Sequence, residues 1–289
     1  MKRSAEDESE FVDLKRVDIA QLKSRIIHGD ARELILKEIQ PNSVALVVTS
    51  PPYPMIQMWD ELFHTMDDTI DIEKQPPMEV FEKMHTQLDT VWKILFSVII
   101  PGGIVVINIG DATRRIGDQF RLFPNGARIT MRMVDIGFTV LPNIYWKKPT
   151  NKPNSFLGSG MLPPNAYVTI DCEHILIFRK GGLRKFPSND QNRIDSAFTQ
   201  AERNTWFTQV WERITGARQH NGSDRRTAAF PDEIPRRLIK MFSVKRDIIL
   251  DPFAGTGTTV NVAKELDRVA IGFEIDQNII ISATKDTNN

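Results

Sequence analysis

Short apolar runs alternate with amphipathic segments through most of this chain, and this alternation constrains its fold more than any other feature. Residues 44–48 form a continuous β-branched and apolar run, as expected for a strand buried on both faces of a parallel sheet. Residues 78–100 have helical periodicity, which a Pro-Gly-Gly break separates from a second apolar run at 104–109. Together these segments predict a doubly wound α/β domain.

Composition narrows the class of protein. The 289 residues, 41% hydrophobic and 26% charged, suit one α/β domain with an inserted segment. The apolar runs are too short to cross a bilayer, and the charged N-terminus has no apolar core of a secretory signal, so we expect a cytoplasmic protein without a membrane partner. Cys172 is the single cysteine, and the five histidines lack metal-ligand spacing, so no metal site is predicted.

Charge is balanced overall but unevenly distributed. Residues 114–132 contain five Arg and one Asp, and residues 213–246 contain nine Lys or Arg and three Asp or Glu. Such segments can bind phosphates locally, although a solvated surface explains them equally well. We expect 114–125 to be a basic loop and 55–77 to be an irregular loop over a site. The candidate phosphate contacts are Arg114, Arg115, Arg121, Lys147, Lys148, Arg225 and Arg226.

A small-residue turn at 251–259 joins a predicted strand to a predicted helix, an arrangement that binds nucleotide-type ligands. A phosphate-binding P-loop would need Lys where Thr258 stands, and a dinucleotide fingerprint would need Gly where Val260 stands. Glu274 ends the next strand, 19 residues after Gly255, where an acid accepts hydrogen bonds from a ribose. The turn therefore predicts an adenosine with a short charged tail, which describes S-adenosylmethionine.

The segment after the run at 44–48 carries a second candidate site. Pro51 and Pro52 cannot continue a central strand, and ligands of open α/β sheets bind at the carboxyl ends of strands. The Ser50 hydroxyl and the Pro51 carbonyl can accept hydrogen bonds from the exocyclic amine of a nucleobase, which would localise its lone pair. Tyr53 offers a flat face for an extruded base. The structural alternative is a proline-rich turn that merely caps a strand.

These segments together resemble the DNA amino-methyltransferases. Ser50-Pro51-Pro52-Tyr53 matches their catalytic motif and, with Thr49, takes the form associated with cytosine-N4 enzymes, whereas adenine-N6 enzymes usually carry Asp or Asn in place of Ser50. Residues 253–257 match the cofactor motif, 29–31 the segment beside the cofactor adenine, and 230–237 the helix at its methionine end. The candidate cofactor residues are Asp30, Thr49, Pro231, Arg237, Asp251, Phe253, Ala254, Gly255, Thr256, Gly257, Thr258 and Glu274.

The order of the motifs, catalytic before cofactor, resembles the circularly permuted β class. The resemblance implies a Rossmann-like, doubly wound mixed sheet of the S-adenosylmethionine-dependent methyltransferase type, with a small recognition insertion. We expect a flexible N-terminal arm at 1–20 and a catalytic half at 21–146. The last sheet strand and the target-recognition region are expected at 147–228, with 186–227 as the best candidate for the recognition insertion, and the cofactor-binding half at 229–289.

The implied activity is methylation of the N4 amine of a flipped cytosine in double-stranded DNA, in a prokaryotic restriction-modification system. A cognate restriction endonuclease is the implied functional partner, and the protein is expected to be a monomer or homodimer. Alternatives are adenine-N6 methylation, protein glutamine or RNA guanine methylation, and a non-catalytic DNA-binding module. A cytosine-C5 enzyme would need a thiolate, and Asp171 and Glu173 beside Cys172 disfavour one.

Overall fold

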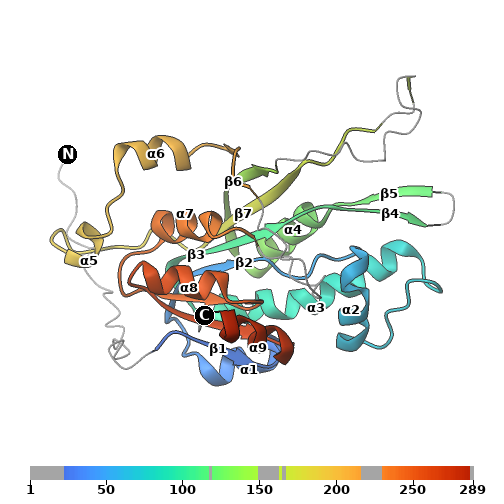
Figure 1. Cartoon of the computed structure of the whole chain (residues 1–289), viewed down its shortest axis with the longest axis horizontal. Helices are drawn as coiled ribbons and strands as arrows, with labels where there is room; N and C mark the ends of the chain where they lie inside the picture. Colours follow the sequence, from blue (N-terminus) through green and yellow to red (C-terminus); the bar gives the residue numbers. More distant parts are fainter. Residues whose placement is uncertain (1–22, 117–118, 149–162, 165–166, 216–229, 287–289) are drawn as a thin grey trace, which may run out of the picture.

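The computed structural model describes residues 23–116, 119–148, 163–164, 167–215 and 230–286. The expected arm at 1–20 and the candidates Arg225 and Arg226 lie outside these ranges. The described residues form an eight-stranded sheet in the order β1-β10-β9-β2-β3-β7-β6-β8 (Figure 1). Its strands are β1 (Arg25–His28), β2 (Val44–Thr49), β3 (Ile99–Ile109), β6 (Phe138–Lys147), β7 (Cys172–Lys180), β8 (Val210–Trp211), β9 (Ile248–Asp251) and β10 (Val269–Glu274).

Five neighbouring strands, from β1 to β3 in sheet order, are parallel, and β7 runs antiparallel to both β3 and β6. This mixed, doubly wound sheet confirms the predicted fold class. β2 lies next to β9 in space although about 200 residues separate them in sequence, so segments from both ends of the chain meet at the middle of the sheet.

Helices cover both faces of the sheet. All six residues of β2 are buried, and alternate residues face different cores: Val47 belongs to one and Val48 to the other. The first core contains α1 (Ala31–Glu38), α3 (Pro77–Val98) and α4 (Asn125–Ile136). The second contains α7 (Glu233–Phe242) and α8 (Thr258–Glu265). α9 (Gln277–Asp286) follows β10.

Strand β3 begins earlier than the sequence predicts. It runs from Ile99 through the Pro-Gly-Gly segment instead of starting at Ile104. The register against β2 shifts there, and Gly102 has a φ of +80° with the Arg184 backbone nitrogen 2.4 Å from where a Cβ would stand. The Gly residues therefore absorb an irregularity within the strand instead of ending it.

The two segments expected to be loops have regular structure. Residues 57–66 form a 3-10 turn, η2 (Gln57–Trp59), and the helix α2 (Asp60–Met66). The basic segment forms an antiparallel hairpin of β4 (Ala112–Ile116) and β5 (Gln119–Phe123), which extends from the body beside the β6–β7 end of the sheet (Figure 1). The loop expectation was therefore wrong for residues 57–66 and for the hairpin, whereas 67–76 form turns without helix or strand. In 57–66, Trp59, Leu62 and Met66 recur at helical spacing among many charges.

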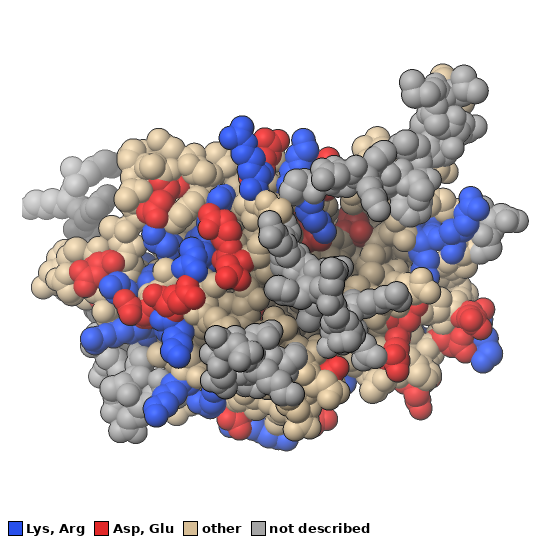
Figure 2. Space-filling model, viewed as in Figure 1, with Lys and Arg blue, Asp and Glu red and all other residues tan. Residues whose placement is uncertain are grey.

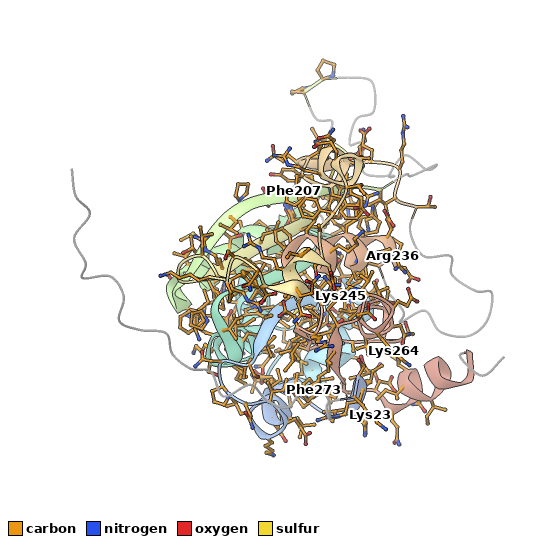
Figure 3. The ribbon with its side chains drawn as sticks, turned by 90° about the vertical axis from the view of Figure 1, so that its left-hand side faces the viewer. Lys23, Phe207, Arg236, Lys245, Lys264 and Phe273 are labelled. Carbon is orange, nitrogen blue, oxygen red and sulfur yellow. The ribbon has the colours of Figure 1, made fainter. Side chains whose placement is uncertain are left out.

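The candidate recognition region contributes short elements at the sheet edge. α5 (Gln191–Ile194) and α6 (Gln200–Trp206) precede β8, which pairs in parallel with the end of β6. Trp206 and Trp211 are buried in the core formed with α7. In Figure 3 Phe207, at the end of α6, lies far from Phe273 on β10. Within the described residues, no helix has both the length and the apolar character needed to span a membrane.

Candidate active site

One cavity lies at the carboxyl ends of the central parallel strands. With its open mouth it encloses about 890 Å³. The loops after β1, β2 and β9 and the end of β10 meet there because neighbouring parallel strands end at the same edge of a sheet. Most candidate residues from both motifs line it: Asp30, Ser50, Pro51, Pro52, Asp251, Phe253, Ala254, Gly255, Thr256, Thr258 and Glu274.

The cofactor turn is shaped by its glycines and by Glu274. Gly257 has a φ of +86°, and a Cβ there would lie 2.6 Å from Cδ1 of Ile26, so only Gly fits. The backbone N–H of Gly255 donates to Oε2 of Glu274 at 2.9 Å, and that of Asp276 donates to Oε1 at 2.9 Å. Burial raises the pKa of Glu274 above its ordinary value. Each carboxylate oxygen keeps a further lone pair that can accept from a ligand hydroxyl in the cavity.

A buried hydrogen bond joins the two motifs. The hydroxyl of Thr49, at the end of β2, donates to Oδ1 of Asp251 at 2.7 Å, and the Phe253 N–H donates to the same oxygen at 3.1 Å. Thr49 does not line the cavity itself, so its contribution is to fix the catalytic loop against the cofactor turn. Burial raises the pKa of Asp251 to about 6, while the Thr49 bond opposes the rise.

The loop after β2, the candidate catalytic loop, is anchored through Tyr53. Its hydroxyl lies 3.2 Å from the Ser50 hydroxyl and donates to Oε2 of Glu173 at 3.0 Å. Nδ2 of Asn108 donates to both the Tyr53 hydroxyl, at 2.9 Å, and the Glu173 carboxylate, at 2.7 Å. Burial and then the charge of Glu173 raise the pKa of Tyr53 well above its ordinary value, so Tyr53 is a neutral phenol. Tyr53 is not among the residues that line the cavity.

The far end of the loop is held by Asn125, at the start of α4. Nδ2 of Asn125 donates to the carbonyls of Pro54 at 3.1 Å and Gly110 at 3.0 Å. Its Oδ1 must therefore accept the 2.9 Å bond from Nε2 of His85, which fixes the proton of that ring on Nε2. Burial lowers the pKa of His85 to about 3, so it is neutral.

Sequence reasoning missed several residues of this site. Trp59, Leu62 and Met66 line the cavity from η2 and α2, and their spacing of three and four residues is a helical signal within the supposed loop. Glu173 and Asn108 were missed because β7 and β3 bring them beside the loop from more than 50 residues away in sequence. Only the fold reveals such contacts.

Some candidate cofactor residues do not reach the cavity. Arg237 pairs with Glu233 at 2.7 Å and stacks over the ring of Trp211, with its guanidinium 5.0 Å from the ring centroid. Pro231 and Gly257 do not line the cavity either, whereas their neighbours Phe230 and Thr256 do. Arg237 thus links α7 to the β8 segment in this structure, and its contact with the cofactor stays a prediction.

Several candidate DNA contacts have partners within the protein. Arg114 makes a bidentate bond to Asp60 at 2.6 and 2.9 Å, which ties the hairpin to α2. Lys147 lies 3.6 Å from Glu212, and Lys148 pairs with Glu173. Arg115 is exposed on β4. On the face seen in Figure 2, basic and acidic side chains of the described residues are interspersed.

A family comparison decides the identity. The model of the N6/N4 methyltransferase family, described as DNA methylase, matches residues 44–285, which include both motifs. The chain belongs to this family of DNA methyltransferases. The Type II methyltransferase M.MjaI of Methanocaldococcus jannaschii is 54% identical over 268 residues, covering 88% of each chain. M.MthZI of Methanothermobacter thermautotrophicus is 47% identical and covers 84% of this chain and 71% of its own.

Solved structures agree with this assignment of the methyltransferase. A putative DNA modification methylase from Thermus thermophilus, complexed with S-adenosyl-L-methionine, is 32% identical with a TM-score of 0.72, covering 91% of this chain and 94% of its own. The cytosine-N4-specific PvuII DNA methyltransferase shares the fold, with a TM-score of 0.65 at 20% identity, covering 91% of this chain and 85% of its own. The protein is thus a DNA amino-methyltransferase of the restriction-modification type.

The cavity suits S-adenosylmethionine, the cofactor of this methyltransferase. The open turn at Gly255 leaves room for a close approach of the ligand, since a Cβ built there meets no atom within 4 Å. Glu274 presents acceptors for a ribose, and Trp59 and Phe253 give apolar walls. S-adenosylmethionine supplies a methyl group on a positively charged sulfonium and leaves as a neutral thioether.

Proposed function

We propose that this methyltransferase modifies the exocyclic N4 amine of cytosine in double-stranded DNA. The observation that carries the proposal is Ser50, a hydroxyl in the cavity wall at the position where adenine enzymes usually carry Asp or Asn. A cytosine extruded from the duplex would enter the cavity beside Ser50. Adenine-N6 methylation is the alternative that the same fold supports.

The proposed site accelerates methyl transfer by holding the amine in position for attack on the methyl group. The amine N–H groups would be held by the Ser50 hydroxyl oxygen and the Pro51 carbonyl, which localises the nitrogen lone pair toward the incoming methyl group. Pro51 and Pro52 are buried and stiffen the loop. Tyr53, the predicted stacking surface, also holds the Ser50 hydroxyl at 3.2 Å. The neutral thioether needs no acid to leave.

The remaining assignments form part of the same proposal. Glu274 would bind the cofactor ribose, and Asp30 would lie near the adenine. The segment 230–237 would contact the methionine end, and the turn at 253–257 would form the cofactor motif. Residues 147–228 would contain the target-recognition region. The candidates for phosphate contacts stay the same seven residues: Arg114, Arg115, Arg121, Lys147, Lys148, Arg225 and Arg226. A cognate restriction endonuclease, and a monomeric or homodimeric state, stay predictions.

Identifying the modified nucleoside tests this proposal. The protein is incubated with genomic DNA that lacks the modification and with methyl-labelled S-adenosylmethionine. The DNA is then digested to nucleosides, which are separated and identified by mass spectrometry. The proposal expects the label in N4-methyldeoxycytidine. Label in N6-methyldeoxyadenosine would keep the family assignment and overturn the choice of base.

A further inference from the structure

We propose that Glu173 accepts the proton released during methyl transfer, through a hydrogen-bonded relay from Ser50 by way of the Tyr53 hydroxyl. This inference rests on the proposed catalytic role of Ser50. Glu173 acts through two other side chains and so is a positioning residue and proton acceptor, not a group that touches the substrate. It extends the reaction to β7, a strand outside the two sequence motifs.

The relay is continuous in the structure. The Ser50 hydroxyl oxygen lies 3.2 Å from the Tyr53 hydroxyl oxygen, which lies 3.0 Å from Oε2 of Glu173. Ser50 lines the cavity at one end of this chain of atoms. Glu173 is only 7% exposed at the other end. The relay therefore leads from the cavity into the protein interior in two short steps.

The direction of each hydrogen bond follows from the donors available. Nδ2 of Asn108 can only donate, and it donates to both the Tyr53 oxygen and the Glu173 carboxylate. An ionised carboxylate can only accept, so the single proton of Tyr53 goes to Glu173. The Tyr53 oxygen then accepts the Ser50 hydroxyl proton. This leaves the lone pairs of Ser50 free to accept from an amine in the cavity.

The contacts of Glu173 are those of a carboxylate anion, the form that can receive a proton. Oε1 of Glu173 pairs with Lys148, whose side chain is 44% exposed, and Oε2 receives the bonds from Tyr53 and Asn108. Asp111, another acid near the loop, is 3.4 Å from His174 and accepts the Gly126 N–H, so it belongs to a separate pair. Within the described part of the chain, Glu173 is the carboxylate that the Ser50–Tyr53 hydrogen bonds lead to.

The relay balances the reaction. As the amine nitrogen forms its bond to the methyl carbon, the carbon–sulfur bond breaks and its electron pair stays on sulfur. The methylated nitrogen is then positively charged and must lose one proton to give the neutral product. That proton passes to Ser50, the Ser50 proton passes to Tyr53, and the Tyr53 proton passes to Glu173. Both hydroxyls are regenerated and Glu173 becomes neutral. A serine alone is too weak a base to retain the proton.

Single-turnover measurements on Glu173→Gln test the relay, because the amide keeps the shape and cannot take the proton. We expect the methyl-transfer rate to fall on the order of 10²–10⁴-fold, the contribution typical of general base catalysis. Cofactor affinity by calorimetry and the KM for DNA should stay near wild type. Glu82→Gln, which removes an exposed carboxylate paired with Arg128 on the helix side of the sheet, is the matched control and should keep the wild-type rate.

Two further variants separate a relay from a structural role. Tyr53→Phe should lower the rate to a similar extent, and adding Glu173→Gln should lower it little more, because both break one relay. Formate should partly restore the rate of Glu173→Ala and should not restore that of Tyr53→Phe. A wild-type rate in Glu173→Gln, additive losses, or a loss accompanied by lost cofactor binding would overturn the relay. A wild-type rate in Ser50→Ala would instead overturn the proposed role of Ser50.

Discussion

The Thr49 hydroxyl donates a 2.7 Å hydrogen bond to the buried carboxylate of Asp251 and so joins the end of β2 to the end of β9. The two residues are 202 positions apart in sequence. Since β2 and β9 pair directly, this bond fixes the position of Ser50 relative to the Gly-rich turn after β9. Precision at the site therefore depends on a side chain that does not line the cavity.

Thr49→Val should destabilise the protein by about 1–3 kcal/mol, because it leaves a buried carboxylate with one fewer donor. It should also raise the pKa of Asp251 further above 6, since the Thr49 bond is the largest influence that lowers it. Urea unfolding at pH 7 measures the effect. Thr49→Ser keeps the hydroxyl and serves as the control, and equal stability of the two variants would show that the bond contributes nothing.

Glu274→Gln should weaken binding of S-adenosylmethionine by about 10–100-fold, the effect of replacing a charged acceptor by a neutral one. Because burial raises the pKa of Glu274, wild-type affinity should fall as the pH is lowered, beginning above the range of an ordinary Glu. The affinity of Glu274→Gln for S-adenosylmethionine should not show this fall at low pH. Calorimetry without DNA measures both, with the exposed Glu265→Gln as control; an unchanged affinity would remove Glu274 from the cofactor site.

His85 should make stability depend on pH. Its pKa is about 3 in the folded protein and 6.5 in the unfolded chain, so its favourable contribution is complete above 6.5 and is lost as the pH falls toward 3. Within that window the slope from this residue approaches about 1.4 kcal/mol per pH unit. Unfolding of His85→Gln between pH 7 and pH 5 should show a shallower dependence than wild type. Identical slopes for the variant and wild type would contradict the assignment.

The Arg114–Asp60 pair should hold α2 over the cavity. Both side chains are about one-fifth exposed, so we expect a coupling energy on the order of 1 kcal/mol in a double-mutant cycle of Arg114→Ala and Asp60→Ala. Either variant should release bound S-adenosylmethionine faster, because Trp59, Leu62 and Met66 on that segment line the cavity. Arg115→Ala, on the same strand, is the control for this off-rate. Additive stability losses would show that the pair does not tether α2.

The sequence predicted correctly those elements whose local residue pattern alone indicates their structure. The run at 44–48 and the turn at 251–259 were placed correctly because a fully buried strand and a Gly-rich turn have local signatures. β3 was predicted too short, because Pro and Gly are usually strand breakers and the register shift that accommodates them is a tertiary feature. The hairpin at 112–123 was missed because cross-strand pairing, unlike helical periodicity, is not local.

In the candidate site too, residues with a local sequence signal were predicted and residues placed by non-local contacts were not. Ser50 and Glu274 were identified because each lies in a motif at the end of a predicted strand, and the structure brings both to one cavity. Lys148 was predicted to be a candidate phosphate contact, and its partner Glu173 was considered only as a neighbour of Cys172. Their pairing depends on β6 and β7 lying side by side, which fixes contacts that no local pattern contains.

The central claim is that the loop from Thr49 to Tyr53 directs the methyl group to the N4 amine of cytosine. The most direct measurement compares wild type and Ser50→Ala by mass spectrometry of nucleosides from the same DNA, against standards of N4-methyl-, 5-methyl- and N6-methyl-nucleosides. We predict N4-methyldeoxycytidine from wild type and strongly reduced product from Ser50→Ala, with cofactor binding retained. N6-methyldeoxyadenosine from wild type, or undiminished product from the variant, would contradict the claim.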